Sequence, residues 1–249
     1  MASKNALKRI LNKDIKEIIN QKLNNNGIYI VFDEENMLSA KAMIVGPKDS
    51  LYESGFLFFN IQFPKNYPYS PPDLSYISRN RVRIHPNLYV GHHSSGFGKV
   101  CLSILGTWSG PKWSSIMDIT TVLLTIQSLL DDNPLHHEPG QEKNVSAMND
   151  LYNEVIRYES INTLLIKNYI DPPVGFEVFH NDMKNEILRM DHEKLKNEFN
   201  LELWENMICT NLFLMIYESP NYEIPSFPNL HIIKVDEERL CNYLFNLRK

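Results

Sequence analysis

The residues best suited to chemistry are one cysteine, Cys101, and a His85-Pro86-Asn87 segment whose histidine precedes it by 16 positions. A cysteine needs less activation than other nucleophilic side chains. An asparagine amide can donate a hydrogen bond to an oxygen atom on which negative charge develops. The pattern therefore permits covalent catalysis through a thiol. The alternative is that Cys101, between Val100 and Leu102, is only a small buried hydrophobe.

The other two cysteines, Cys209 and Cys241, lie among apolar residues and are expected to be structural. Three cysteines without a CxxC pair do not form a disulfide framework or a thiolate metal site. The adjacent His92 and His93 have no flanking Cys or carboxylate, so we expect no metal there either. Unpaired cysteines favour a reducing compartment, and the expected localisation is cytoplasmic and/or nuclear.

The composition is that of an ordinary globular protein. The 249 residues are 43% hydrophobic and 22% charged, and 25 Lys+Arg against 30 Asp+Glu give a net charge of −5. This acidic balance argues against nucleic acid as a partner, since phosphate binding needs a basic excess. The most apolar stretch is too short to span a bilayer, so we expect no membrane association.

The elements that must position these residues follow from periodicity. Apolar residues at helical spacing predict a helix near the N-terminus, with a buried stripe made of Leu7, Ile10, Leu11, Ile15, Ile18 and Ile19. Strand-like runs with short connections predict an antiparallel meander, at residues 27–32, 39–46, 56–63 and 73–78.

The remaining chain is predicted to be mainly helical after a long irregular segment at 79–115. The proline-rich FPKNYPYSPP at 63–72 excludes a helix there. A wide apolar stripe over 119–130 predicts a buried helix, with Asp118 as its N-cap. Separate helical segments are expected beyond residue 146, around 151–156, 161–166, 175–218 and 237–247.

The order of these motifs resembles the ubiquitin-conjugating (E2) family. The matching tracts are FPKNYPYSPP (63–72), IHPNLY (84–89), GKVCLSILG (98–106), KWS (112–114) and SLLDDNP (128–134). The resemblance covers about residues 4–170. The tracts VCLSILGTWSGPKWS and DDNPLHHEPG look closest to the large Z-type members, which carry a C-terminal extension.

The resemblance implies an α+β ubiquitin-conjugating (UBC) fold. Such a fold has an N-terminal helix, a four-stranded antiparallel meander sheet, an active-site loop and C-terminal helices. The core would occupy residues 1–170, and residues 171–249 would form a mainly helical extension.

The resemblance also implies an activity. An E2 enzyme accepts ubiquitin, or a ubiquitin-like protein, from an E1 activating enzyme as a thioester, here on Cys101. It then transfers the modifier to a substrate lysine, usually with an E3 ligase. No cofactor is implied, because ATP is consumed by the partner E1.

Further site residues follow from the same resemblance. Asn87 would stabilise the oxyanion or the active-site loop, and His85 would brace that loop. After Asn133-Pro134, where the family often places an Asp, this chain has His136 and His137. His136 is a possible gate or base, although either histidine could be a plain surface residue. The linker at 90–98 is also longer than usual.

Two partner surfaces are implied. The basic face of the first helix would meet the E1 through Lys4, Lys8, Arg9 and Lys13, where opposite charge would speed encounter. The ligase-facing edge would consist of Tyr69, Ser114 and Ser115. Ser115 stands where a proline is commoner in the family.

Two rival functions remain. A catalytically modest or inactive E2-like ubiquitin-binding adaptor would need neither Cys101 nor Asn87, and both are present. A cysteine hydrolase would need a histidine placed to activate Cys101, and the order of the motifs argues against it.

Overall fold

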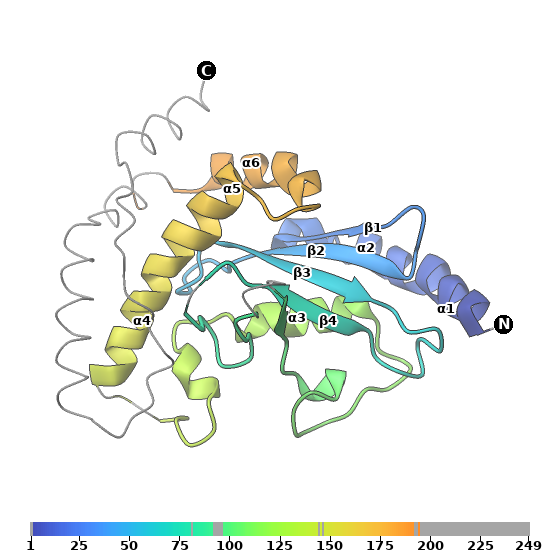
Figure 1. The fold of residues 1–249 in the computed structure, drawn as a ribbon, viewed down its shortest axis with the longest axis horizontal. Coiled ribbons are helices and arrows are strands. Elements are labelled where there is room, and N and C mark those ends of the chain that lie inside the picture. The colour runs from blue at the N-terminus through green and yellow to red at the C-terminus, as the bar shows by residue number, and fades with distance from the viewer. Residues whose placement is uncertain are drawn as a thin grey trace.

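The computed structural model describes residues 2–80, 82–91, 97–143, 145, 147–191 and 194. Its centre is an antiparallel sheet whose strands pair in chain order (Figure 1). The strands are β1 Ile28–Phe32, β2 Ser39–Val45, β3 Phe56–Gln62, β4 Asp73–Ile77 and β5 Phe97–Lys99. The predicted meander is confirmed, and each of its strands ends within one residue of the expected place. The short β5 is a fifth strand that the sequence analysis did not predict.

One face of the sheet packs against the first helices and α3. An N-terminal helix is formed by α1 (Ala2–Arg9), the π-helical turn η1 (Ile10–Asp14) and α2 (Ile15–Asn20). The buried α3 (Ile119–Leu129) begins at the predicted N-cap, because the Asp118 carboxylate accepts from the N–H of Thr121 at 3.0 Å. Both helices contribute to the main hydrophobic core with this face of the sheet.

The predicted stripe of the first helix was partly wrong. Leu11 is 52% exposed and Ile19 is 66% exposed, while Ala6 and Asp14 are buried. The reason is the π-helical turn between Ile10 and Asp14, which rotates the following side chains relative to a regular α-helix. A charged residue, Asp14, therefore occupies an inward position.

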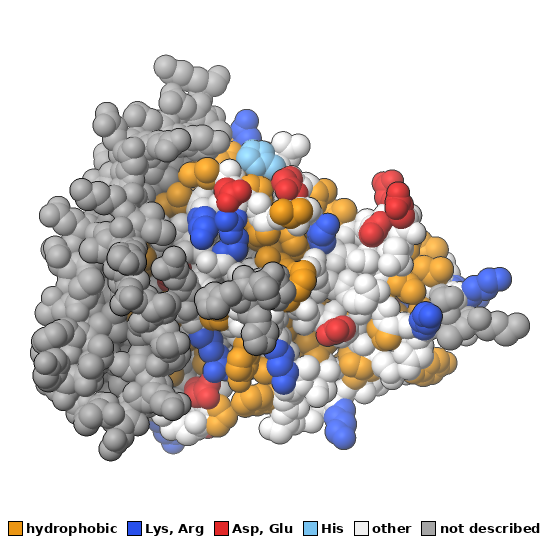
Figure 2. Space-filling model, viewed as in Figure 1, with side chains coloured by type: hydrophobic (Ala, Val, Ile, Leu, Met, Phe, Trp, Pro, Cys, Tyr) orange, Lys and Arg blue, Asp and Glu red, His pale blue; other side chains and the backbone are white. Residues whose placement is uncertain are grey.

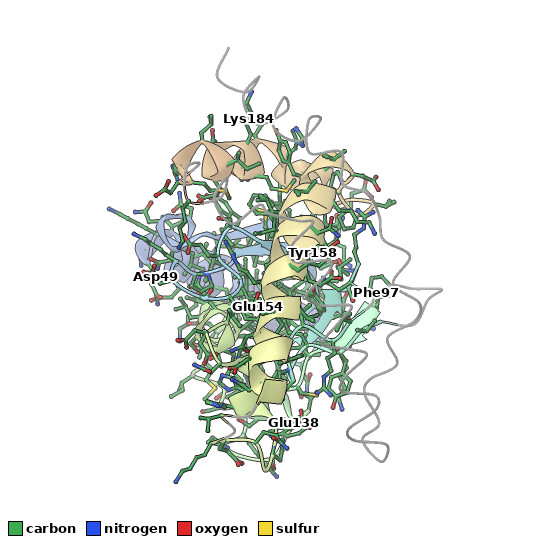
Figure 3. All side chains as sticks on the ribbon, turned by 90° about the vertical axis from the view of Figure 1, so that its left-hand side faces the viewer. Asp49, Phe97, Glu138, Glu154, Tyr158 and Lys184 are labelled. Carbon is green, nitrogen blue, oxygen red and sulfur yellow. The ribbon has the colours of Figure 1, made fainter. Side chains whose placement is uncertain are left out.

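A long helix, beginning at Ala147, runs past the end of the sheet. It consists of α4 (Ala147–Glu159), the π-helical η5 (Ser160–Lys167) and α5 (Asn168–Ile170), so the two separately predicted segments are continuous. In this helix, the side-chain amide of Asn168 donates to the carbonyl oxygen of Phe56, at the start of β3, at 2.8 Å. Figure 3 shows this helix, with Glu154 and Tyr158, crossing between Asp49 and Phe97.

The opposite face of the sheet is covered by the segment that follows this helix. The chain forms a short turn, η6 (Glu177–Phe179), and then α6 (His180–Arg189), which lies over the sheet in Figure 1. A second hydrophobic cluster joins them to the sheet, with buried members Met43, Phe56, Phe58, Ile77, Leu165, Tyr169, Phe176, Phe179, Met183 and Ile187. The sheet thus has helices packed on both of its faces.

The remaining short helical turns are η2 Leu23–Asn26, η3 Ser103–Leu105 and η4 Pro134–His137. The helices predicted for residues beyond 194, and with them Cys209 and Cys241, lie outside the described residues. Among the helices of the described ranges, none has the length and apolar character needed to cross a membrane.

Candidate active site

Cys101 lies directly after the edge strand of the sheet. The chain leaves β5 at Lys99, and Val100 forms a single β-bridge with Leu88. Gly98 permits this approach, because a Cβ atom at that position would stand 1.8 Å from the carbonyl oxygen of Tyr89. Cys101 itself is 1% exposed. The thiol is therefore held at the seam between the sheet and the His85–Tyr89 loop.

Asn87 holds the backbone of Cys101 at two points. Its side-chain Nδ2 donates to the carbonyl oxygen of Cys101 at 2.6 Å, and the N–H of Cys101 donates to the carbonyl oxygen of Asn87 at 2.9 Å. One hydrogen of the Nδ2 group remains for another acceptor. The structure thus brings these two predicted residues together through the backbone of Cys101.

His85 is buried beneath this loop as a neutral ring. Its Nδ1 accepts from the N–H of Asn87 at 3.0 Å, so the proton sits on Nε2, which donates to the carbonyl oxygen of Leu129 at 2.9 Å. Burial, together with the nearby His137, lowers the pKa of His85 from 6.5 to about 3. A ring with both nitrogens engaged and no charge near neutral pH can join the loop to α3.

The two histidines of η4 are placed differently. His137 faces inward: its ring centroid is 5.0 Å from that of His85, and its Nε2 lies 2.8 Å from Oδ2 of Asp131. His136 is half-buried in the same turn, where its N–H donates to the carbonyl oxygen of Asn133 at 3.0 Å. The inward place beside His85 is therefore taken by His137.

Arg83 is a contributor that the sequence analysis missed. Its guanidinium donates to the carbonyl oxygen of Pro86, lies 3.8 Å from the ring centroid of Tyr89 and pairs with Glu138 at 3.6 Å. It thus joins the loop that carries Asn87 to the end of η4. No spacing or composition signal distinguishes this arginine, because its role depends on the shape of an irregular loop and on Glu138, which is distant in the sequence.

The predicted E1-facing residues divide into two pairs. Lys4 and Lys8 are exposed. Arg9 donates to the carbonyl oxygen of Met117 at 2.7 Å, and Lys13 donates to that of Ile116 at 2.8 Å. Arg9 and Lys13 therefore also fasten the first helix to the segment before α3.

The predicted ligase-facing residues are brought together from two loops. Trp113 Nε1 donates to the carbonyl oxygen of Pro68 at 2.6 Å, which places the 113–116 segment beside the proline-rich loop. Tyr69 is 78% exposed, Ser115 is exposed and Ser114 is half-buried. Ile116, 75% exposed, was missed because a lone apolar residue in a loop gives no periodic signal.

A buried carboxylate connects these two surfaces. Asp14 accepts from the hydroxyl of Tyr67 and, at 3.1 Å, from the N–H of Ile119, and it lies 3.5 Å from Nε of Arg9. Burial raises the pKa of Asp14, whereas these partners act to lower it. The first helix, the proline-rich loop and the start of α3 thus meet at one polar group.

The linker before Cys101 contains the two adjacent histidines for which no metal was expected. His92, His93, Ser94 and Ser95 lie outside the described residues. Within the ranges that the structure describes, no three His, Cys, Asp or Glu side chains gather as a metal site would require.

Comparison with known proteins places this site in a family. The ubiquitin-conjugating enzyme family model matches residues 10–162. "Ubiquitin-conjugating enzyme E2 Z" of Xenopus tropicalis is 44% identical over 138 residues, which cover 54% of this chain and 42% of that protein. The Homo sapiens protein of the same name is 45% identical over 139 residues, which cover 54% of this chain and 37% of that protein.

A plant protein matches over a longer stretch. "Putative ubiquitin-conjugating enzyme E2 38" of Arabidopsis thaliana is 34% identical over 207 residues, covering 78% of this chain and 58% of that protein. The chain thus matches about two fifths of the length of the E2 Z proteins. Because the family model spans more than half of the 249 residues, the chain belongs to the ubiquitin-conjugating enzyme family, with likeness to its Z-type members.

Proposed function

We propose that this chain is an E2 transferase. It accepts ubiquitin, or a ubiquitin-like protein, from an E1 enzyme as a thioester on Cys101 and transfers it to a substrate lysine, with an E3 ligase. The thiol of Cys101 attacks the E1 thioester, the E1 thiol leaves, and no net oxidation or reduction takes place. ATP is consumed by the E1, so no cofactor is needed on this chain.

The observation that carries the proposal is the double hydrogen bond between Asn87 and Cys101. When a lysine amine attacks the thioester, negative charge develops on the carbonyl oxygen. An amide N–H fixed beside the sulfur can stabilise that charge without reorganising. Nδ2 of Asn87 uses one hydrogen for the Cys101 carbonyl oxygen at 2.6 Å and keeps the second for this task.

The surroundings of the thiol restrict access to it. Cys101 is 1% exposed, so the proposed transfer requires neighbouring side chains to move when the charged E1 binds. His85 has both ring nitrogens engaged, which supports the role of a loop brace rather than of a proton carrier. His136, half-buried in the same turn as His137, is our candidate for the gate or base near the incoming lysine.

The partner surfaces are proposed on the same basis. Lys and Arg side chains lie near the N-terminal end of the molecule, at the right of Figure 2. Lys4 and Lys8 are exposed and would steer an acidic E1 surface, with Arg9 and Lys13 at the edge of the same contact. Tyr69, Ser114 and Ser115, with the exposed Ile116, would form the ligase contact.

A charging assay tests the function. The full chain is incubated with ATP, with two different E1 enzymes and with several modifiers in separate reactions, and the products are separated without reductant. At least one pair should give a modifier adduct that dithiothreitol cleaves. An adduct of the same yield on Cys101→Ala, or no adduct from any pair, would count against the proposal. The E2-like adaptor predicts binding of a modifier without an adduct.

A further inference from the structure

Thr107 reaches back to the backbone on both sides of Cys101. After Cys101 the chain forms the turn η3 and then passes through Gly106, whose φ of 71° lies in the left-handed region that glycine tolerates. This reversal brings the hydroxyl of Thr107 to 2.7 Å from the carbonyl oxygen of Val100. The N–H of Leu102 donates to the same hydroxyl at 2.9 Å.

The contacts of Thr107 complete those of Asn87. Four backbone polar groups adjoin the Cα atom of Cys101: the Val100 carbonyl, both groups of Cys101 and the Leu102 N–H. Asn87 binds the two groups of Cys101, and Thr107 binds the other two. The residue is thus held from both sides.

These contacts replace those that a neighbouring strand would supply. Strand β5 ends at Lys99 and Val100 forms a bridge to Leu88, while Val100, Cys101 and Leu102 are all at most 5% exposed. Buried backbone groups require partners. The Thr107 hydroxyl can satisfy both the Val100 carbonyl and the Leu102 N–H, because one oxygen can donate its single proton and accept another hydrogen bond. Its oxygen also lies 3.1 Å from the carbonyl oxygen of Leu102, a second acceptor for the same proton.

We propose that Thr107 is a positioning residue for thioester transfer, because it fixes the backbone before and after Cys101 and thereby the direction of the thiol toward the Asn87 amide. The inference rests on the proposed E2 function. Transfer depends on placing the reacting atoms within a fraction of an ångström, and small displacements lower such rates steeply. Thr107 would therefore affect the rate of the chemical step more than the binding of the amine.

The experiment is single-turnover discharge of the preformed adduct to free lysine over a range of lysine concentrations. Thr107→Val keeps the shape and removes both hydrogen bonds, so we expect the maximal rate to fall about tenfold or more, with the half-saturating lysine concentration unchanged within about twofold. Thr107→Ser keeps the hydroxyl and should stay within about threefold of the wild type. The matched control is Thr125→Val, since the Thr125 hydroxyl donates within α3, to the Thr121 carbonyl oxygen at 2.7 Å.

Two results would overturn the inference: a folded Thr107→Val that discharges at the wild-type rate, or a Thr107→Ser as slow as Thr107→Val. If Thr107→Val does not fold, amide hydrogen exchange of the unaltered protein decides. The Leu102 N–H should be protected, and exchange as fast as that of an exposed amide would contradict the proposal. Absence of any adduct on the unaltered chain is a different result, which would refute the transferase function itself.

Discussion

The Nε2 atom of His85 donates to the carbonyl oxygen of Leu129 at 2.9 Å and so joins the active-site loop to the last residue of α3. This bond requires the neutral tautomer with its proton on Nε2, because Nδ1 is the acceptor for the N–H of Asn87. Protonation of Nδ1 would remove that acceptor. The loop that carries Asn87 therefore depends on a buried, uncharged histidine.

This dependence predicts a pH effect on stability. The pKa of His85 is about 3 in the folded protein, against 6.5 ordinarily. Between these values the unfolded chain binds a proton that the folded protein does not. The stability that the buried neutral ring of His85 contributes is therefore fully present above pH 6.5 and is lost as the pH falls toward 3. The full window corresponds to roughly 3–5 kcal/mol of unfolding free energy.

Urea denaturation between pH 4 and 7.5 checks this prediction. Neutral His85→Gln should be less sensitive to acid than the wild type, while His180→Gln, at an exposed site on α6, should keep the wild-type slope. The three proteins carry the same carboxyl groups, so the differences between them report His85. Parallel pH profiles for the wild type and His85→Gln would show that the ring is not buried uncharged.

Asn87 is predicted to serve the discharge step more than folding. Asn87→Asp keeps the size of the side chain but replaces the donor with an oxygen that faces the carbonyl oxygen of Cys101, now 2.6 Å from Nδ2. Loss of one donor to a developing oxyanion costs about 10²–10³ in rate. Single-turnover discharge to lysine should fall by that factor while the adduct still forms. Equal losses in formation and discharge would instead indicate a purely structural residue.

Arg83 is predicted to couple the loop to η4. Its three contacts, to Pro86, Tyr89 and Glu138, need a planar guanidinium that stacks and donates at once. Arg83→Lys should therefore slow lysine discharge by about fivefold or more, since lysine cannot keep all three contacts. Arg189→Lys, at an exposed arginine that pairs with Glu186 on α6, provides the matched control and should leave the rate unchanged. Wild-type discharge by Arg83→Lys would argue against the coupling.

The segment after residue 170 is predicted to be part of the folded unit. Phe179 is fully buried and packs against Phe58 and Phe176, with ring centroids 6.3 and 6.2 Å away. Phe179→Ala should lower the unfolding free energy by about 3–5 kcal/mol. The adjacent Val178→Ala, at a residue 51% exposed, should cost about 0.5 kcal/mol or less. Chemical denaturation measures both, and equal stabilities would mean that α6 does not cover the sheet in solution.

Local patterns in the sequence predicted the strands and α3 well, because alternation and capping are encoded within a few residues. Asp118 is the clearest case, since its N-cap role needs only its neighbours. The first helix was harder to predict, because a π-helical turn between Ile10 and Asp14 shifts the buried face and leaves Leu11 exposed.

The sequence contained an overlooked pattern that indicates a second helical layer on the outer face of the sheet. In β3, Phe56 and Phe58 alternate with Leu57 and Phe59, so both faces of the strand are apolar, as in a sheet buried on two sides. The motifs did identify Cys101, Asn87 and His85. Arg83 and Thr107 could not be found in this way, because their partners are set by loops whose shape has no periodicity.

The central claim, that Cys101 carries the modifier, is tested most directly by Cys101→Ser in the charging reaction. The account predicts that the wild-type adduct is cleaved by dithiothreitol, since a thiol exchanges readily with a thioester. Cys101→Ser should form an oxygen ester that resists the same treatment, and Cys101→Ala should form none. A dithiothreitol-sensitive adduct on Cys101→Ser would place the modifier on another cysteine and contradict the account.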